Sequence, residues 1–242
     1  MERLLLSVDP PRSGEANMET DFQLLQKLQA ASEPRTIVRF YRWDRPTASI
    51  GKHQIPEKAL DSDYCFRAAI PVVRRPTGGR AVFHADEVTY AFVSNHPSLV
   101  RGPGVSRASR LIAAGLREGL VRIGLQTDSP GRTSRRTPCP RSAVKSPCFA
   151  STSQTELSVG QLKLAGSAQC RLPRAILQHG SIPLRIDFPV MSQVLGCTEF
   201  LLKSHMTSVS AALGREIGFE ELVECLAEGL MWLDDEDYQI PE

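Results

Sequence analysis

The sequence lacks any early hydrophobic run long enough to cross a membrane or to form the core of a signal peptide. Its first apolar run extends only from Leu4 to Leu6, whereas a spanning helix needs about 20 apolar residues. A hydrophobic content of 41% and a charged content of 23% are typical of a soluble globular protein. We therefore expect a cytoplasmic protein that does not bind membranes, with 242 residues forming one domain of ordinary size.

The sequence also lacks the cysteine spacing of a metal site or a disulfide framework. Its six cysteines are Cys65, Cys139, Cys148, Cys170, Cys197 and Cys225, and none of them forms a C-x-x-C pair. This pattern argues against a structural zinc site and against a disulfide-stapled fold. We expect free thiols in a reducing compartment, with no metal and no cofactor.

A strong excess of either charge is missing as well, because the formal net charge is only +2. Nucleic-acid binding would require a larger basic face with recognition elements, so we expect no nucleic-acid partner. Basic residues nevertheless gather between Thr127 and Pro147, a segment with Asp128 as its one acidic residue. This long loop without apolar periodicity is either a solvated, mobile connection or a surface that steers an acidic partner.

Alternating and helical patterns predict an α+β fold, in which helices flank a mixed, largely antiparallel sheet. We expect a first helix from Met18 to Ala31 with Asn17 as its N-cap, and a final amphipathic helix between Phe219 and Leu230. Residues 1–190 should form the main domain, and residues 191–242 should pack on it as a helical extension. The other expected strands cover 3–8, 36–43, 48–51 and parts of 149–188, and the other expected helices cover 56–68, 106–124 and residues from 199 onward.

The segment from Pro71 to Val93 holds the first candidate site, a Pro-Thr-Gly-Gly turn between two apolar strands. Gly78 and Gly79 can adopt positive φ, and successive N–H groups of such a turn can point together at an anion or a carbonyl. Arg75, Arg80 and His84 surround the turn. These residues suit an acyl carboxylate, thioester or phosphate, although an ordinary hairpin with solvated arginines would show the same pattern.

A second candidate is the hairpin predicted for Thr155 to Ala165, with Gly160 and Gln161 as a two-residue turn of type II′. In this register Ser158 faces Lys163 on one side of the hairpin. The opposite side carries the apolar residues Leu157, Val159, Leu162 and Leu164, which should face the core. From the residues alone, Lys163 reads either as a functional group or as an exposed lysine on a solvated face.

Two long segments resemble a known superfamily. RRPTGGRAVFHADEVTY begins at Arg74, and SPCFASTSQTELSVGQLKLAGSAQCRLPRAILQHGSIPL runs from Ser146 to Leu184. Together they are similar to the biotin/lipoate protein ligase superfamily, in the branch of the LipM-type octanoyltransferases. The similarity extends from about Phe40 to Leu184 and implies the catalytic-domain fold of that superfamily.

The resemblance implies a catalytic pair. Cys148 matches the cysteine that carries an acyl-thioester intermediate, and Lys163 matches the lysine paired with it. An ordinary thiol is only a few per cent ionised at pH 7, and a nearby ammonium would favour the thiolate nucleophile. The expected substrate-binding residues are Arg75, Thr77, Gly78, Gly79, Arg80, His84, Gly166, Ser167, Ala168, His179 and Gly180. Both histidines could equally be structural, and Cys148 could be a buried structural cysteine.

The implied reaction is transfer of an octanoyl or lipoyl group from octanoyl-acyl carrier protein to a lysine of a lipoyl-domain protein, such as glycine cleavage H protein. We expect the enzyme to act as a monomer. The alternatives are an ATP-dependent lipoate or biotin ligase, an amidotransferase between lipoyl-domain proteins, and a member that only binds. The short C-terminal region favours transfer, whereas Thr155 before Glu156 and Ala85 after His84 depart from the family pattern.

Overall fold

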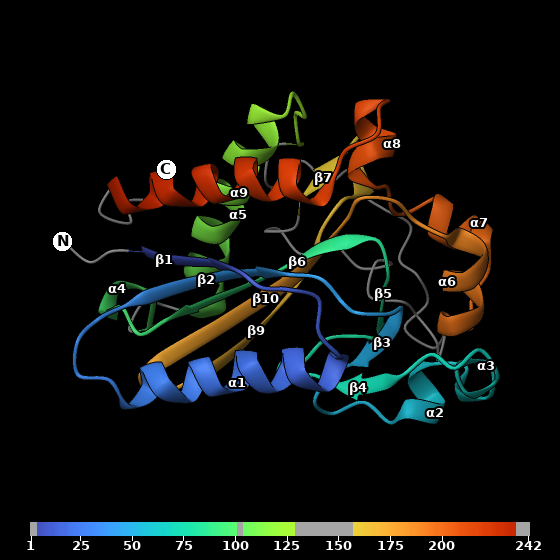
Figure 1. Cartoon of the computed structure of the whole chain (residues 1–242), viewed down its shortest axis with the longest axis horizontal. Helices are drawn as coiled ribbons and strands as arrows, with labels where there is room; N and C mark the ends of the chain where they lie inside the picture. The colour runs from blue at the N-terminus through green and yellow to red at the C-terminus, as the bar shows by residue number, and fades with distance from the viewer. Residues whose placement is uncertain (1–3, 101–103, 129–156, 236–242) are drawn as a thin grey trace.

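A five-stranded sheet forms the centre of the computed structural model of the protein, which describes residues 4–100, 104–128 and 157–235 (Figure 1). The strands follow the order β1 (Leu4–Val8), β2 (Thr36–Tyr41), β6 (Glu87–Ser94), β10 (Ala175–Pro183) and β9 (Gly166–Leu172). β1 runs parallel to β2, and the other neighbouring strands are antiparallel. The predicted α+β fold with a mixed, largely antiparallel sheet is therefore confirmed.

Helices cover both faces of this sheet. α1 (Gly14–Ala30) lies on one face, and α5 (Gly104–Arg122) and α9 (Phe219–Asp235) lie on the other (Figure 1). Alternation along β6 supplies both cores, because Val88, Tyr90 and Phe92 belong to the α5–α9 side while Ala91 and Val93 belong to the α1 side. A Cβ on Gly229 of α9 would lie 2.3 Å from the Gly119 nitrogen of α5. The backbones of α5 and α9 are therefore in direct contact at these glycines.

The first helix begins three residues before the predicted N-cap. Ser13 caps it by accepting a hydrogen bond from the Ala16 amide, and the Asn17 amide already donates to the Ser13 carbonyl. The prediction of Asn17 as N-cap is wrong because that side chain is buried and has tertiary partners instead. The side-chain nitrogen Nδ2 of Asn17 donates to the Arg12 and Arg42 carbonyls, and its side-chain oxygen Oδ1 accepts from Arg39.

A separate three-stranded sheet carries the Pro-Thr-Gly-Gly segment. Its order is β4 (Val72–Arg74), β3 (Thr47–Ile50) and β5 (Val82–His84), with β4 parallel and β5 antiparallel to β3. The reading of this segment as a hairpin is wrong, since β3 lies between the two strands. The turn therefore crosses over the end of β3 instead of joining neighbouring strands. The short helices α2 (Pro56–Ala59) and α3 (Ser62–Arg67) connect the two parallel strands of this sheet.

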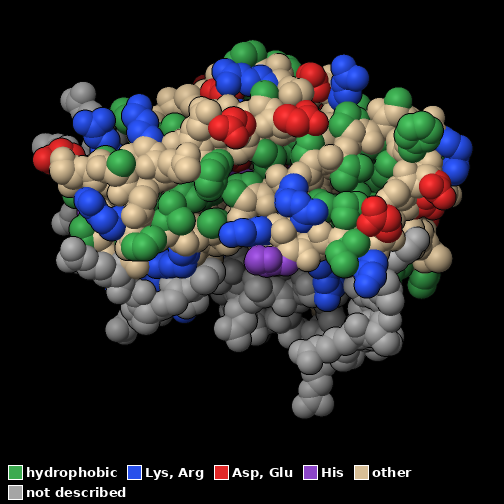
Figure 2. Space-filling model, turned by 90° about the horizontal axis from the view of Figure 1, so that it is seen from below, with side chains coloured by type: hydrophobic (Ala, Val, Ile, Leu, Met, Phe, Trp, Pro, Cys, Tyr) green, Lys and Arg blue, Asp and Glu red, His purple; other side chains and the backbone are tan. Residues whose placement is uncertain are grey.

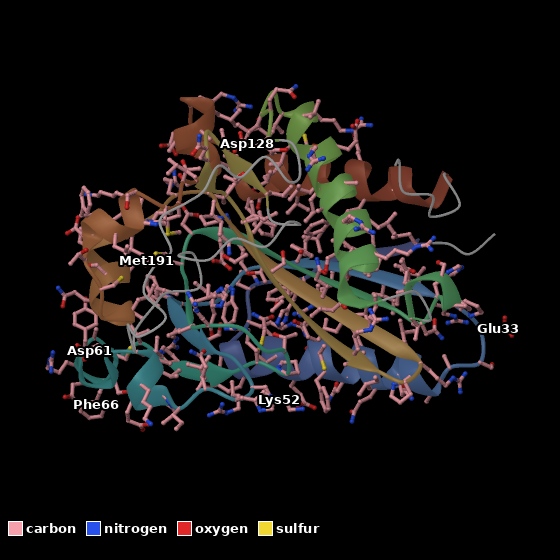
Figure 3. All side chains as sticks on the ribbon, turned by 180° about the vertical axis from the view of Figure 1, so that it is seen from behind. Glu33, Lys52, Asp61, Phe66, Asp128 and Met191 are labelled. Atoms are coloured by element: carbon pink, nitrogen blue, oxygen red, sulfur yellow. The ribbon has the colours of Figure 1, made fainter. Side chains whose placement is uncertain are left out.

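The predicted second hairpin is present as β7 (Ser158–Val159) and β8 (Leu162–Lys163), and Ser158 pairs with Lys163 as expected. Gly160 and Gln161 have φ values of 55° and 69°, so the turn is of type I′ and the predicted type II′ is wrong. Asp128 fixes it by accepting from the Ser158 hydroxyl and from both turn amides. Figure 3 labels Asp128, which lies beside this hairpin.

The remaining described helices are α4 (Pro97–Val100), α6 (Phe188–Leu195), α7 (Glu199–Lys203) and α8 (Val209–Leu213). α6 begins before the predicted start of the helical region at Glu199. Asp187 caps it by accepting from the Val190 amide, and Gly196 ends it in the left-handed conformation with φ 61°. Across the described ranges, no helix is both long and apolar enough to span a membrane.

Candidate active site

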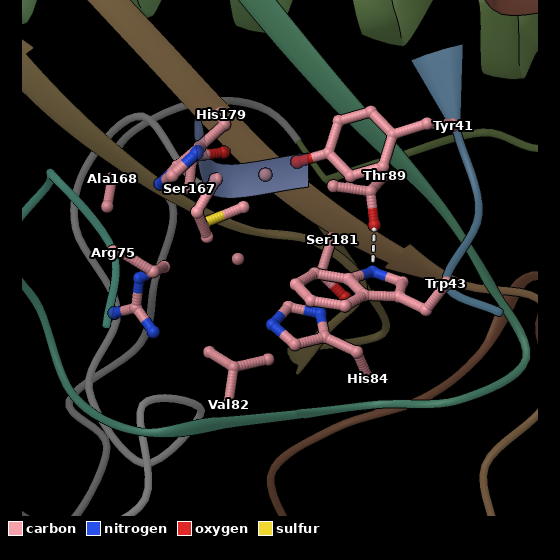
Figure 4. Close-up of a pocket in the computed structure, with 13 residues that line it drawn as sticks. Tyr41, Trp43, Arg75, Val82, His84, Thr89, Ser167, Ala168, His179 and Ser181 are labelled. Atoms are coloured by element: carbon pink, nitrogen blue, oxygen red, sulfur yellow. Dashed lines mark hydrogen bonds between the residues drawn. The ribbon is translucent and has the colours of Figure 1, made fainter. Parts of the chain in front are cut away.

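A cavity lies where α1, the five-stranded sheet, the three-stranded sheet and Arg75 come together (Figure 4). The space between its walls measures about 370 Å³ when the open solvent at its mouth is included. Aromatic and aliphatic side chains share the wall with a few polar groups. The lining residues are Met18, Tyr41, Trp43, Arg75, Val82, His84, Thr89, Gly166, Ser167, Ala168, His179, Gly180 and Ser181.

The structure brings most of the predicted site residues to this cavity. From the first motif Arg75 and His84 line it, and from the second motif the lining residues are Gly166, Ser167, Ala168, His179 and Gly180. Thr77 lies behind the wall, where its hydroxyl is 2.6 Å from His179 Nε2. The predicted residues Gly78, Gly79, Arg80 and Lys163 are not among the lining residues, and Cys148 lies outside the described part of the chain.

Arg75 holds the Gly-Gly turn in place. Its guanidinium is buried and donates to the carbonyls of Ser49, Gly78 and Arg80 and to the Ser49 hydroxyl, at 2.8–3.1 Å. Gly79 has φ 93°, as the sequence predicted for this turn, while Gly78 is not among the residues with positive φ. Arg75 therefore supports the turn, and its guanidinium also faces the cavity (Figure 4).

The backbone of Gly51 lies against the Gly-Gly turn, where a side chain would not fit. A Cβ at Gly51 would lie 2.2 Å from the Gly79 carbonyl oxygen, so the Gly51→Ala variant must displace the turn. We expect it to lose about 1–3 kcal/mol of unfolding free energy and at least tenfold in activity. Urea denaturation measures the first effect. Gly78→Ala is the stability control, because a Cβ there meets nothing within 4 Å.

His84 is held by a buried carboxylate. Its Nδ1 lies 2.8 Å from Glu87, and its Nε2 lies 2.6 Å from the Ser49 hydroxyl. The Glu87 carboxylate can only accept, so Nδ1 of His84 donates to it, while Nε2 faces the Ser49 hydroxyl. The His84 ring stacks on Trp43 with centroids 4.1 Å apart. The indole N–H of Trp43 donates to Thr89 at 2.8 Å (Figure 4), so this wall has one fixed arrangement.

His179 has a matching arrangement on the other side of the cavity. Its Nδ1 lies 3.0 Å from Asp21, and its Nε2 faces Thr77. Asp21 also accepts from the Arg39 guanidinium at 2.6 Å and from the Tyr41 hydroxyl at 3.0 Å. Burial, followed by the charge of Asp21, raises the Tyr41 pKa well above its usual value, so Tyr41 donates as a neutral phenol.

Comparison with known proteins places this geometry in a family. Residues 13–231 match the family model of the lipoyl protein ligase A/B catalytic domain. The chain belongs to this family. Solved structures of similar fold include lipoate-protein ligase A bound with ATP, with a TM-score of 0.74 and 23% identity over 97% of this chain and 86% of that chain. An archaeal bi-partite lipoate protein ligase system from Thermoplasma acidophilum gives a TM-score of 0.69 with 20% identity, covering 100% and 86%.

Curated relatives within the lipoyl protein ligase A/B family are more similar in sequence. An octanoyltransferase LipM of Symbiobacterium thermophilum is 34% identical over 226 residues, which cover 90% of this chain and 81% of the relative. The same-named protein of Geobacillus kaustophilus is 42% identical over 180 residues, covering 71% and 62%. The predicted superfamily and branch are confirmed, as is the predicted enzyme class, an acyltransferase.

Lys163 does not lie on a solvated face, although it faces Ser158 as predicted. Its exposed fraction is 0%. Its amide donates to the His205 carbonyl at 2.8 Å, and its own carbonyl accepts from the Thr207 amide at 3.0 Å. The segment between α7 and α8 thus holds the lysine backbone three residues before Gly166. On the apolar side of the hairpin, Leu157 and Leu164 are buried as expected, whereas Val159 and Leu162 are half-buried.

The sequence analysis missed the acidic partners of both histidines. Asp21 lies four residues before Leu25 and seven before Leu28, which puts it on the buried face of α1. A carboxylate at this spacing was a readable signal. Glu87 follows His84 by three residues, but its role depends on the turn between β5 and β6, which a pattern of residue types does not define.

Two buried groups with lowered pKa values make the stability depend on pH. Burial lowers the pKa of His179, and the charges of Arg75 and His84 add to this effect, although Asp21 opposes it. Burial alone would raise the Glu87 pKa, but His84 and the hydrogen bonds from Ser181 and Thr89 lower it overall. In the unfolded chain His179 takes up a proton near pH 6.5 and Glu87 near pH 4.5.

Since the unfolded state binds more protons, we expect the free energy of unfolding to fall as the pH drops below about 6.5, and again below about 4.5. Each proton contributes a slope of at most about 1.4 kcal/mol per pH unit. Urea denaturation at pH 7.5, 6.5 and 5.5 tests the first step. The His179→Gln variant should have a flatter profile, whereas His53→Gln, at an exposed position, should retain the wild-type slope. A wild-type profile that rises toward acid would contradict this reading.

Proposed function

We propose that this protein is a cysteine-dependent octanoyltransferase of protein lipoylation. It would move an octanoyl or lipoyl group from acyl carrier protein to a lysine of a lipoyl-domain protein, for example glycine cleavage H protein. The observation that carries the proposal is the cavity on which both family motifs converge. The relatives that are 34% and 42% identical to it over the aligned residues and bear the name octanoyltransferase LipM support the same reaction.

The reaction would run in two thioester-level steps. The Cys148 thiolate attacks the carbonyl carbon of the octanoyl thioester, a new carbon–sulfur bond forms, and the thiolate of the carrier's pantetheine leaves and takes up a proton. The amine of the acceptor lysine then attacks the acyl-enzyme. An amide forms, and Cys148 is released as a thiol after the amine has lost its proton. The acyl group of a thioester is already activated for transfer, so neither step consumes ATP.

The walls of the cavity fit an acyl group. Tyr41, Trp43 and Val82 offer apolar surface for a hydrocarbon chain. Backbone amides of Gly166, Ser167 and Ala168, or of the Gly79 turn, would stabilise the oxyanion of each tetrahedral intermediate. Lys163 would favour the thiolate and manage the proton of the amine. His84 and His179 each donate from the ring nitrogen that faces a carboxylate, and these contacts fix the shape of the cavity.

Transfer to an apo lipoyl domain tests the proposed function. The purified protein is incubated with octanoyl-acyl carrier protein and apo lipoyl domain without ATP, and the mass of the acceptor is recorded. We expect the acceptor to gain one octanoyl group. Modification that appears only with ATP and free octanoate or lipoate would instead identify a ligase. Modification only from an octanoylated lipoyl domain would identify an amidotransferase, and binding of the domain without turnover would identify a non-enzymatic member. The cytoplasmic location and monomeric state remain predictions.

A further inference from the structure

We infer that Met18 is the end wall that limits the length of the acyl chain, and that an outer groove continues behind it. The inference rests on the proposed function, because it concerns the same cavity. Met18 lies on α1, is almost fully buried and lines the site cavity. It also lines a second depression on the molecular surface. The two spaces therefore meet at this side chain.

The outer groove lies between α1, β4 and the far end of β9. Figure 2 shows the face that carries α1, where apolar side chains lie among lysines and arginines. Two groove residues on this face are exposed hydrophobics, Phe22 with an exposed fraction of 36% and Val72 with 37%. The remaining lining residues are Glu15, Met18, Glu19, Lys52, Val73, Arg74, Arg75, Pro76, Cys170 and Leu172. The groove thus offers a hydrocarbon chain the apolar surface of Phe22, Val72 and Leu172 between charged side chains.

Of the residues shared by the two spaces, Met18 is the one that can move. Met18 and Arg75 line both the cavity and the groove. The Arg75 guanidinium is fixed by four hydrogen bonds to the turn and to Ser49. A methionine side chain has three rotatable bonds and is held here only by apolar packing in the α1 core. The flexible Met18 side chain therefore separates the cavity from the groove.

The direction of β9 relates the groove to the reacting end of the site. β9 starts at Gly166, three residues after Lys163, and its early residues Gly166, Ser167 and Ala168 line the cavity. Cys170 and Leu172 follow on the same face of the strand as Ala168 and line the groove. An acyl chain whose carbonyl lies near Gly166 and which extends along β9 therefore points toward Met18 and the groove.

Chain length then decides whether the groove is needed. The seven carbon–carbon bonds of an octanoyl group, at about 1.5 Å each, reach at most about 10 Å. The four steps along an antiparallel strand from Gly166 to Cys170 span about 14 Å. An octanoyl group therefore ends inside the cavity, before the groove residue Cys170. A chain of twelve carbons would have to pass Met18.

The acyl-chain profile of Met18→Ala tests the inference. Wild type, Met18→Ala and the remote control Met231→Ala, an exposed methionine on α9, are each incubated with acyl carrier protein loaded with 8, 10, 12 or 14 carbons. The initial rates of transfer to an apo lipoyl domain are compared. Each buried methylene is worth roughly fourfold in binding. We expect the C12-to-C8 rate ratio to rise at least tenfold in Met18→Ala and to remain unchanged in Met231→Ala.

Second variants separate the possible failures. Adding Val72→Trp to Met18→Ala fills the groove and should return the ratio to the wild-type value. Met18→Val replaces Met18→Ala if the alanine variant does not fold, because it removes less buried volume. A folded variant that transfers C8 with an unchanged profile would overturn the inference while leaving the proposed function intact. Wild type that transfers no C8 group would overturn the proposed function and the inference with it.

Discussion

Replacing Asp21 by alanine is expected to lower the free energy of unfolding by about 3–5 kcal/mol. This carboxylate is completely buried and accepts from Arg39, Tyr41 and His179. Its removal leaves the Arg39 guanidinium in the protein interior with Asp9 as its remaining acidic partner. Breaking a buried ion pair in this way costs more than removing both charges, because one desolvated charge remains. Urea denaturation at pH 7.5 measures the change.

Two further variants make this prediction specific. Asp63→Ala, at an exposed position on α3, should change the stability by less than about 0.5 kcal/mol. Arg39→Met in the Asp21→Ala background should recover part of the loss, because it removes a buried charge that has lost one of its two acidic partners. A loss below 1 kcal/mol for Asp21→Ala would mean that the network does not stabilise the fold as the structure indicates.

Replacing Lys163 by methionine is expected to slow octanoyl transfer by a factor of about 100 to 10,000, the usual contribution of a positioned acid or base. Methionine keeps most of the side-chain volume at this fully buried position but removes the ammonium group. Transfer rates with saturating donor and acceptor measure the effect, and Lys58→Met, at an exposed position on α2, should retain wild-type activity.

A second readout distinguishes the proposed role of Lys163 from a structural one. If its ammonium favours the thiolate, alkylation of Cys148 by iodoacetamide should require a higher pH in Lys163→Met than in wild type. The free energy of unfolding of the variant is measured in parallel. A stable variant with unchanged transfer and an unchanged alkylation profile would remove Lys163 from the mechanism.

The sequence predicted best those elements that depend on neighbouring residues in the chain. Strict alternation around a two-residue turn places Ser158 opposite Lys163, and the structure has this pair. The turn is nevertheless of type I′, because Gln161 adopts φ 69°, a conformation that Asp128 supports by binding both turn amides. Asp128 lies 32 residues from Gly160 in the chain, so no local pattern could reveal this contact.

The errors arose where a distant element inserts between neighbours in sequence. β4 and β5 flank the Gly-Gly turn but pair with β3 instead of each other, and β3 lies more than twenty residues upstream. Asn17 is a favourable N-cap residue by type, yet its side chain is used to bind Arg39 and two carbonyls. For the site, the two motifs predicted which segments meet. The spacing of Asp21 on α1 signalled a buried carboxylate, but its pairing with His179, and that of Glu87 with His84, emerge only from the tertiary structure.

The central claim is that an acyl group is carried by Cys148 without the use of ATP. The most direct measurement is the intact mass of the protein after incubation with octanoyl-acyl carrier protein alone, for wild type, Cys148→Ala and the control Cys170→Ala. The account predicts one octanoyl adduct that is released by hydroxylamine on wild type and Cys170→Ala, and none on Cys148→Ala. An adduct that persists on Cys148→Ala, or octanoyl transfer by this variant at the wild-type rate, would contradict it.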